Sequence, residues 1–241
     1  MAKLPNTLDE LLAVYLEDAD MSQEFEIKFG TKGMHAITKI KYQNVIKRML
    51  SLGFKPATAQ DTYLLRVVNN FITQEGSVIQ SNIRTEIEGL GDIQNYCRTN
   101  ALTNRETGEL ELDVDFVQKK KKKTNDGAVI QSVDNRDFNF RASLSTETKF
   151  MPNSNIITDL INSWNENKKI FRYMNRVRLV HEDYPLFVDC SIVKSSRRKG
   201  YSMIPEYTIQ EANVFQNVES YEIEIETVSY THLTLPTNRE V

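Results

Sequence analysis

Apolar and polar residues alternate along eight separate stretches of the chain, which is the pattern of half-buried β-strands. These stretches cover residues 24–29, 62–73, 78–90, 112–123, 138–150, 171–182, 186–196 and 221–226. Polar loops separate most of them, and few helical segments lie between them. Such a series favours antiparallel pairing, so we predict a mainly β, α+β protein built as a barrel or a sandwich.

Three further segments show the spacing of amphipathic helices. The first begins after a cap at Asn6 or Thr7 and carries leucines at positions 8, 11, 12 and 16 along one stripe. The second covers 36–52 and ends at Gly53, and a short third one covers 156–167. The sequence therefore predicts a few helices that cover a mostly β core.

The composition narrows the class of protein. With 241 residues, 40% of them hydrophobic, the chain can bury a real core, and barrels often reach this size as one domain. A net charge of −3 excludes a globally basic nucleic-acid binder, so anion binding would need a local group of Lys and Arg. Cys97 and Cys190 alone exclude a disulfide scaffold and a Cys-rich zinc site. Because the sequence has no membrane-length apolar run and no signal peptide, we expect an intracellular protein with no membrane partner.

Two of the predicted strands carry carboxylates on a single face. Glu24 and Glu26 alternate with apolar residues in the first strand, and Glu222, Glu224 and Glu226 do so in the last. The simplest interpretation is a pair of half-buried strands whose solvent faces happen to be acidic. Like charges along one strand repel, however, and two such strands make a functional cluster the better hypothesis.

Other predicted strands carry a complementary charge. Arginines share single faces of these strands, at positions 84, 141, 172, 176 and 178. A barrel with charged faces inward and apolar faces outward would bring these groups together in a polar lumen. Oxygen-only ligands suit Mg²⁺ or Mn²⁺, and planar guanidinium groups suit phosphate oxygens. The pattern therefore predicts a site that hydrolyses phosphate compounds with the help of a metal ion.

The chain resembles the triphosphate tunnel metalloenzymes. "EFEIKF" (24–29) and "YEIEIE" (221–226) look like their paired glutamate strands. The middle of the chain is similar to the RNA 5′-triphosphatase domain of capping enzymes from large cytoplasmic DNA viruses, in the stretches 81–100, 138–148 and 176–194. The resemblance implies an antiparallel eight-stranded tunnel barrel. It also implies removal of the γ-phosphate from triphosphate-ended RNA with Mg²⁺ or Mn²⁺, the first step of mRNA cap formation.

The resemblance also implies roles for individual residues. Metal ligands would be Glu24, Glu26 and Glu226, and Glu224 and Glu226 would share ligand and water-orienting roles. The triphosphate would be held by a basic set that comprises Arg84, Arg141, Arg176, Arg178 and Lys194, of which Arg141, Arg176 and Arg178 would also act in catalysis. Asp189 and Glu222 would be structural acids of the tunnel, although strict alternation places Lys194 on the face opposite Asp189.

Two other functions stay open at this point. Lys28 completes a Glu-x-Glu-x-Lys start that is typical of the branch acting on thiamine triphosphate or tripolyphosphate. A barrel that binds RNA ends or a partner protein without turnover is the third possibility. The lysine run 119–123 is interpreted as a solvated strand end beside a turn, and His35 and His181 as structural or exposed residues.

The last fourteen residues, 228–241, break the alternation, and the first ten of them match the translation of a sequencing adapter. We therefore expect a helix over 1–20, a tunnel domain over 21–227, and a non-native tail that makes His232 irrelevant. Such a truncated gene would have lost a following guanylyltransferase domain.

Overall fold

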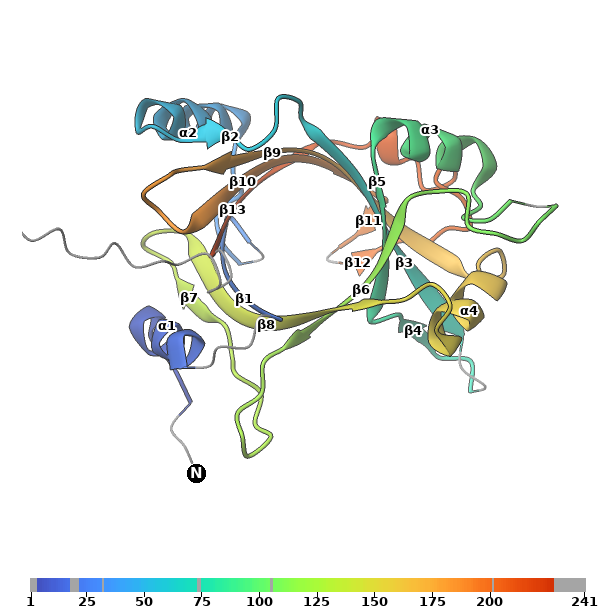
Figure 1. The fold of residues 1–241 in the computed structure, drawn as a ribbon, viewed down its shortest axis with the longest axis horizontal. Coiled ribbons are helices and arrows are strands. Elements are labelled where there is room, and N and C mark those ends of the chain that lie inside the picture. The colour runs from blue at the N-terminus through green and yellow to red at the C-terminus, as the bar shows by residue number, and fades with distance from the viewer. Residues whose placement is uncertain are drawn as a thin grey trace, which may run out of the picture.

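The computed structural model describes residues 4–17, 22–31, 33–72, 75–104, 106–200 and 202–227. Eight strands form a closed antiparallel barrel, seen end-on as the ring in Figure 1. In chain order they are β1 (Gln23–Phe29), β3 (Thr62–Ile72), β5 (Ile83–Glu88), β6 (Val114–Lys121), β8 (Phe140–Phe150), β9 (Lys168–Val180), β10 (Leu186–Ser195) and β13 (Ser220–Thr227). Each falls within or overlaps one of the predicted strands, so the predicted eight-stranded barrel is confirmed.

The strands follow the order β1-β8-β6-β5-β3-β9-β10-β13 around the barrel. The pairing of β3 with β9 and of β13 with β1 closes the ring. Residues directly opposite each other in an antiparallel pair project to the same side of the sheet. The register therefore places Glu24, Glu26, Glu222, Glu224 and Glu226 on the same face as Arg84, Arg176 and Arg178, the inner one, as the alternation predicts.

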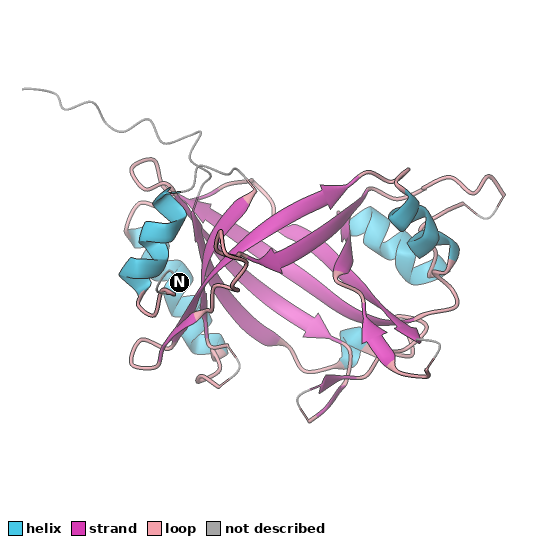
Figure 2. Ribbon diagram, turned by 90° about the horizontal axis from the view of Figure 1, so that it is seen from below, coloured by secondary structure: helices cyan, strands magenta, loops and turns pink. Residues whose placement is uncertain are grey.

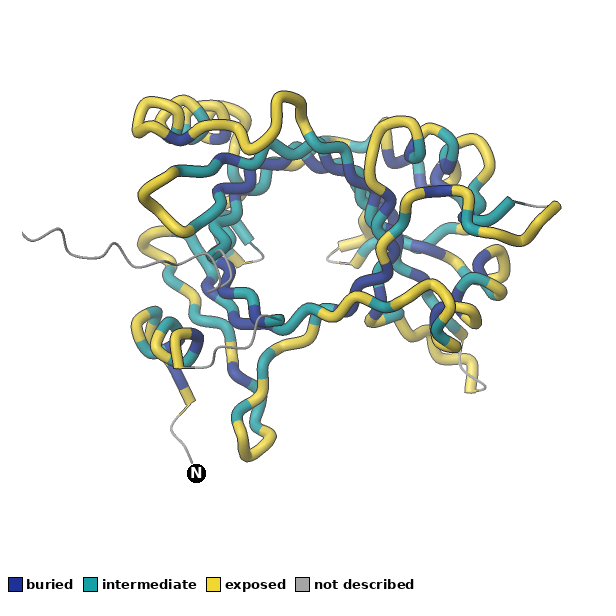
Figure 3. Tube along the Cα trace, in the orientation of Figure 1, coloured by how far each residue is buried: buried dark blue, intermediate teal, exposed yellow. Residues whose placement is uncertain are grey.

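Four α-helices cover the outside of the barrel: α1 (Leu8–Glu17), α2 (Lys39–Ser51), α3 (Leu90–Thr99) and α4 (Asn155–Asn162). Figures 1 and 2 show α1 and α2 on one side of the barrel and α3 and α4 on the other. Apolar residues on the outer faces of the strands pack against these helices, for example Phe25 against α1 and Ile223 against α2. Figure 3 shows the resulting buried positions along the barrel wall.

The predicted cap of the first helix is confirmed, whereas α2 begins at Lys39, three residues after the predicted start at 36. Thr7 accepts a hydrogen bond from the backbone N–H of Glu10, and the Glu10 carboxylate accepts from the N–H groups of Asn6 and Thr7. This reciprocal arrangement satisfies donors that the first helical turn leaves free. Thr38 caps α2 in the same way by accepting from the N–H of Lys41.

The structure contains one helix, α3 (Leu90–Thr99), and one interruption of a strand that the sequence did not predict. The predicted strand 78–90 divides at Ser81 into β4 (Val78–Gln80) and β5, and the chain then continues directly into α3. Gly89 makes this turn with a φ of 87°, a value that disfavours residues with a side chain. Two glycines at the start of α3 hide its helical periodicity in the sequence.

The remaining elements are short. They are β2 (Lys55–Pro56), β7 (Val133–Asn135), β11 (Arg198–Lys199), β12 (Ser202–Met203) and the 3₁₀ turn η1 (Val214–Gln216). The strands β11 and β12 pair with each other as a hairpin that follows β10. Among the described residues, no helix has the length and apolarity that crossing a membrane requires. The predicted adapter tail, 228–241 with His232, lies outside the described residues, as does the predicted boundary at 20–21.

Candidate active site

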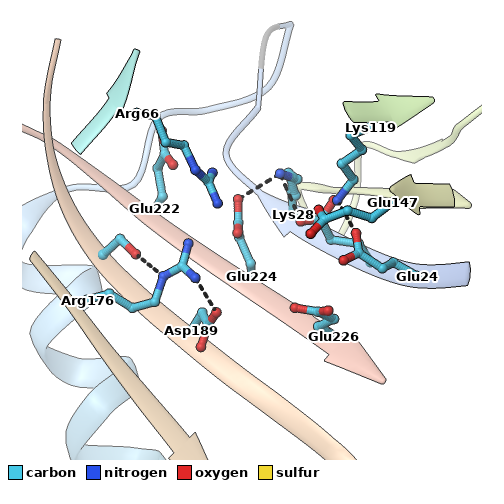
Figure 4. Close-up of polar contacts among 12 residues, drawn as sticks. Glu24, Lys28, Arg66, Lys119, Glu147, Arg176, Asp189, Glu222, Glu224 and Glu226 are labelled. Atoms are coloured by element: carbon cyan, nitrogen blue, oxygen red, sulfur yellow. Dashed lines mark hydrogen bonds and ion pairs between the residues drawn. The ribbon is translucent and has the colours of Figure 1, made fainter. Parts of the chain in front are cut away.

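The two acidic strands lie side by side in the barrel wall. Strand β13 pairs with β1 so that Glu226 stands opposite Glu26, and Glu224 stands opposite Lys28. On its other edge β13 pairs with β10, which places Glu224 opposite Asp189. Because all these side chains share the inner face, the alternating acids at the two ends of the sequence form one carboxylate cluster inside the barrel (Figure 4).

Two lysines neutralise part of this carboxylate cluster. The Lys119 ammonium lies 2.6 Å from Glu24 Oε2 and 3.1 Å from Glu26 Oε2. The Lys28 ammonium lies 2.9 Å from Glu26 Oε1 and 2.8 Å from Glu224 Oε1. Burial disfavours the charged form of Lys119, but Glu26 and Glu24 outweigh this effect and raise its pKa. Lys119 therefore stays charged beside the acids.

The two central glutamates of β13 differ in their ionisation. Burial acts to raise the pKa of Glu224, but Lys28, Arg176 and Arg66 outweigh it and lower that pKa to about 2. For Glu226, burial and the neighbouring Glu24 carboxylate raise the pKa to about 7, against the smaller opposing effect of Arg178. At neutral pH Glu224 is fully ionised, whereas Glu226 is poised between its two forms.

A group of arginines, mainly on β9, β3 and β5, faces the acidic strands. Arg178 donates to both Asp189 carboxylate oxygens at 2.7 Å, and Arg176 lies 3.1 Å from the same carboxylate. Arg66 and Arg84 share the Glu86 carboxylate at 2.6 and 2.7 Å. Asp189 is almost fully buried, so it fixes Arg176 and Arg178 from behind and leaves their remaining donors available to a ligand.

A further cationic group lies at one mouth of the barrel. Arg172 donates to both oxygens of Glu222 at 2.7 and 2.8 Å. A cavity of about 660 Å³ opens at this mouth, and Lys28, Arg66, Arg84 and Arg172 line it without any carboxylate among its lining residues. A ligand that enters here meets positive charge first, so the cavity favours a polyanion.

Part of the lumen is apolar. Leu64, Met174 and Val193 occupy inner-face positions and form a small buried cluster. The sequence interpretation of a wholly polar lumen is therefore wrong at this point. The cluster fills the space beside the arginines and holds the chains of β3, β9 and β10 together from inside.

The structure brings together nine of the eleven residues to which the resemblance assigns a role in the site. These are the five glutamates Glu24, Glu26, Glu222, Glu224 and Glu226, with Asp189, Arg84, Arg176 and Arg178. Arg141 also belongs to the inner face, but its guanidinium is bound by both oxygens of Asp134 on β7, at 2.6 and 2.8 Å. Lys194 lies on the outer face and donates to the carbonyl of Phe215, so its predicted place in the tunnel is wrong.

Other lumen residues had no predicted role in the site, although the sequence already placed Arg172 on the charged face of its strand. They are Lys28, Arg66, Glu86, Lys119, Glu147 and Arg172. The interpretation of the lysine run as a solvated strand end is wrong for Lys119, which alternation from Val117 would have placed on the inner face. Arg66 could have been found in the same way, because it is the one charged residue within the apolar strand β3.

The carboxylates of the lumen are ligands of the kind that a hard cation prefers, although their arrangement among the described residues is not that of a metal site. Across the described ranges, no three Asp, Glu, His or Cys side chains come together closely enough to hold a metal ion. Glu24 and Glu26 nevertheless converge on one cation, the Lys119 ammonium. Carboxylate oxygens from two adjacent strands are ligands of the kind that Mg²⁺ and Mn²⁺ prefer.

Comparison with solved structures finds chains that are similar to this one. The Mimivirus capping enzyme triphosphatase matches with a TM-score of 0.57 and 14% sequence identity, over 92% of this chain and 90% of that chain. The Pct1 RNA triphosphatase of S. pombe matches with a TM-score of 0.42 and 15% identity, over 94% of this chain and 80% of that chain.

No protein-family model matches the chain, and no curated protein matches it in sequence. The likeness to the Mimivirus structure therefore rests on three-dimensional arrangement, and it extends over nearly the whole of both chains. Taken with the closed ring of eight antiparallel strands, it shows that this chain has the tunnel-barrel fold of a viral capping enzyme triphosphatase.

Proposed function

We propose that the protein removes the γ-phosphate from the 5′ end of triphosphate RNA in a metal-dependent hydrolysis, the first step of mRNA cap formation. The observation that carries this proposal is the pairing of Glu26 with Glu226 on adjacent strands of a closed barrel whose strands β3, β5 and β9 carry arginines on the inner face. Hydrolysis of a phosphoanhydride needs a place for a cation and a place for phosphate oxygens, and the two walls provide one each.

Glu24, Glu26 and Glu226 would hold Mg²⁺ or Mn²⁺. When bound, the metal ion would polarise the terminal phosphoryl group. Arg176 and Arg178 would bind the non-bridging phosphate oxygens, since Asp189 already fixes their orientation. Arg66 and Arg84 extend this basic wall toward the mouth and would hold the remaining phosphates.

The charged groups of the lumen are paired with one another, and the substrate would exchange these internal pairs for new ones. Lys119 now occupies the position between Glu24 and Glu26, and Lys28 that between Glu26 and Glu224. A divalent cation between the acids would release both ammonium groups, which could then turn to phosphate oxygens. The net charge of the lumen would change little, so binding would avoid the cost of burying an unpaired charge.

Glu224 would orient the attacking water. Its low pKa keeps it ionised at neutral pH, so it accepts hydrogen bonds from water and donates none. Its position opposite Asp189 and Lys28 places it between the arginine wall and the proposed cation ligands. A carboxylate that accepts from water helps to direct a lone pair toward the phosphorus atom.

The fold likeness to a capping enzyme triphosphatase supports RNA as the substrate. In cap formation the diphosphate end that remains is the substrate of a guanylyltransferase. We therefore expect the protein to act together with such an enzyme or domain.

The test is phosphate release by the purified protein with Mg²⁺ or Mn²⁺ from triphosphate-ended RNA, ATP and tripolyphosphate. A Glu26→Ala/Glu226→Ala double variant serves as the control, with circular dichroism to establish that it folds. We expect metal-dependent release from RNA that the folded double variant loses. No release from any substrate by a well-folded wild type would overturn the proposal and favour a barrel that binds without turnover.

Lys28 favours a second candidate, a triphosphatase that acts on tripolyphosphate or thiamine triphosphate. Its ammonium lies inside the lumen between Glu26 and Glu224, where a small linear polyphosphate could use it. Faster turnover of tripolyphosphate than of RNA in the same assay would move the protein to this activity.

A further inference from the structure

A basic hairpin stands at the cationic mouth of the barrel. Strands β11 and β12 continue from the end of β10 and pair through Arg198 with Met203 and Lys199 with Ser202. Figure 1 shows the hairpin within the outline of the ring, and Figure 2 shows a short hairpin protruding from one end of the barrel. The chain that leaves the barrel wall therefore returns across its opening.

The hairpin borders the route into the lumen on both of its sides. Ser202 and Met203 line the 660 Å³ cavity together with Arg66, Arg84 and Arg172. Arg198 lines a neighbouring hollow of about 550 Å³ that also includes Ser195 and Ser220, and the strand register places both serines on the inner face. A long ligand that leaves the lumen through this mouth therefore passes the hairpin.

Two of the cationic side chains of the hairpin, Arg198 and Lys199, form no ion pair with any described residue. Arg197 is tied to Glu206 at 3.3 Å, which anchors the base of the hairpin. Arg198 and Lys199 are exposed. Cations that are left unpaired at a mouth already lined by four basic residues extend the positive field outward from the lumen.

We propose that Arg198 and Lys199 bind the phosphodiester backbone of the substrate RNA just beyond its triphosphate end. This inference rests on the proposed function, and it names the feature that separates RNA from smaller triphosphates. A free tripolyphosphate would end within the lumen and leave Arg198 and Lys199 unused, whereas each nucleotide that follows the triphosphate would bring another phosphate toward them. The hairpin therefore confers a preference for polynucleotides without taking part in the hydrolysis.

The lining of the mouth cavity agrees with a nucleotide at this position. Val68, Ile170 and Met203 offer apolar surface to a base, and Asn70 and Gln80 offer amide groups to its polar edge. Protein contacts to single-stranded RNA combine such surfaces for bases with cations for the backbone. An acidic protein segment would use the cations but would leave the amides without a matched role.

The experiment compares the wild type with an Arg198→Ala/Lys199→Ala variant and a control, Lys47→Ala/Arg48→Ala. The control removes the same charge from α2, outside the barrel. Steady-state kinetics are measured on a triphosphate-ended oligoribonucleotide and on tripolyphosphate. We expect kcat/KM for the RNA to fall about tenfold through KM in the hairpin variant, as lost phosphate contacts predict. Turnover of tripolyphosphate should stay unchanged in both variants, and the control should match the wild type on both substrates.

A binding measurement separates failure of this inference from failure of the proposed function. Fluorescence anisotropy with a labelled oligoribonucleotide, at several salt concentrations, needs no turnover. We expect the slope of log K against log salt to fall by about 1.4 in the hairpin variant, about 0.7 for each lost contact with a single strand. An unchanged slope together with unchanged RNA kinetics would overturn the inference, as would an equal loss of activity on tripolyphosphate. If the wild type hydrolyses nothing, the proposed function fails, and the salt slope still decides the role of the hairpin.

Discussion

Glu224 and Glu226 lie two residues apart on one face of one strand, yet their surroundings shift their pKa values in opposite directions. Glu224 lies among Lys28, Arg66 and Arg176, and its pKa falls to about 2. Glu226 is half enclosed near Glu24 and Asp189, with Arg178 at 3.6 Å, and its pKa rises to about 7. The same side chain in the same strand therefore meets an excess of positive charge at one position and a deficit at the next.

This difference shows that the lumen has two electrostatic compartments. Around Glu224 the side chains of Lys28, Arg66 and Arg176 supply positive charge, and a bound phosphate group could contact the same side chains. The part around Glu226 lacks positive charge, since only Lys119 and Arg178 oppose the acids there. A metal ion would supply this missing charge, which is why we assign the metal to Glu24, Glu26 and Glu226 and the water to Glu224.

The largest expected effect comes from separate Glu224→Gln and Glu226→Gln substitutions. Each removes one charge and keeps the shape, so we expect each to lower kcat about 10²–10⁴-fold, the range of acid–base and positioning residues. Affinity for Mn²⁺, measured by calorimetry, should fall only in Glu226→Gln. An equal loss of Mn²⁺ affinity in both variants would show that the two glutamates have the same role.

The next effect is expected from Lys28→Met. This change removes the main cation beside Glu224 and leaves Glu26 and Glu224 facing each other without it. We expect kcat to fall about 10²-fold and the acidic limb of its pH profile to move upward, because Glu224 now holds a proton more strongly. A pH profile that does not move would mean that Lys28 does not set the ionisation of Glu224.

A smaller effect concerns stability in the absence of metal. Between pH 4.5 and about 7 the folded state keeps a proton on Glu226 that the unfolded state has lost, so stability falls as pH rises through this window. We expect Glu226→Gln to be more stable than the wild type at pH 8, by at most about 3 kcal/mol. The two should be alike near pH 4, as measured by urea unfolding. A wild type that is the more stable protein at pH 8 would contradict the raised pKa.

The smallest expected effect is that of Lys194→Ala. Since this ammonium binds the carbonyl of Phe215 on the outside of the barrel, its loss should leave kcat/KM within about twofold of the wild type, as for most surface changes. A matched Arg176→Ala variant, which changes the inner face of the neighbouring strand, should lose most activity. A comparable loss of activity in the two variants would show that Lys194 does act in the site.

The sequence could predict which face of a strand a residue occupies, because periodicity decides this. It could not predict which side chains contact each other across different strands. Alternation alone predicts that Glu24, Glu26, Glu224 and Glu226 share the inner face, because a strand offers only two faces. It could not show that Lys119 reaches Glu24, since that contact depends on β1 and β6 both pairing with β8. It also could not show that Arg141 is bound by Asp134, because the short strand β7 carries no clear pattern.

The closure of the ring has a consequence for how the protein is made. The two strands that carry the proposed metal ligands lie near residues 26 and 226, so they meet only after almost all of the described chain has left the ribosome. Until then β1 has one edge covered by β8 and the other open, and contacts of such long range form slowly. We expect slow refolding, with activity recovering in step with the last phase, and a nascent chain that depends on chaperones while its edge strand waits for a partner.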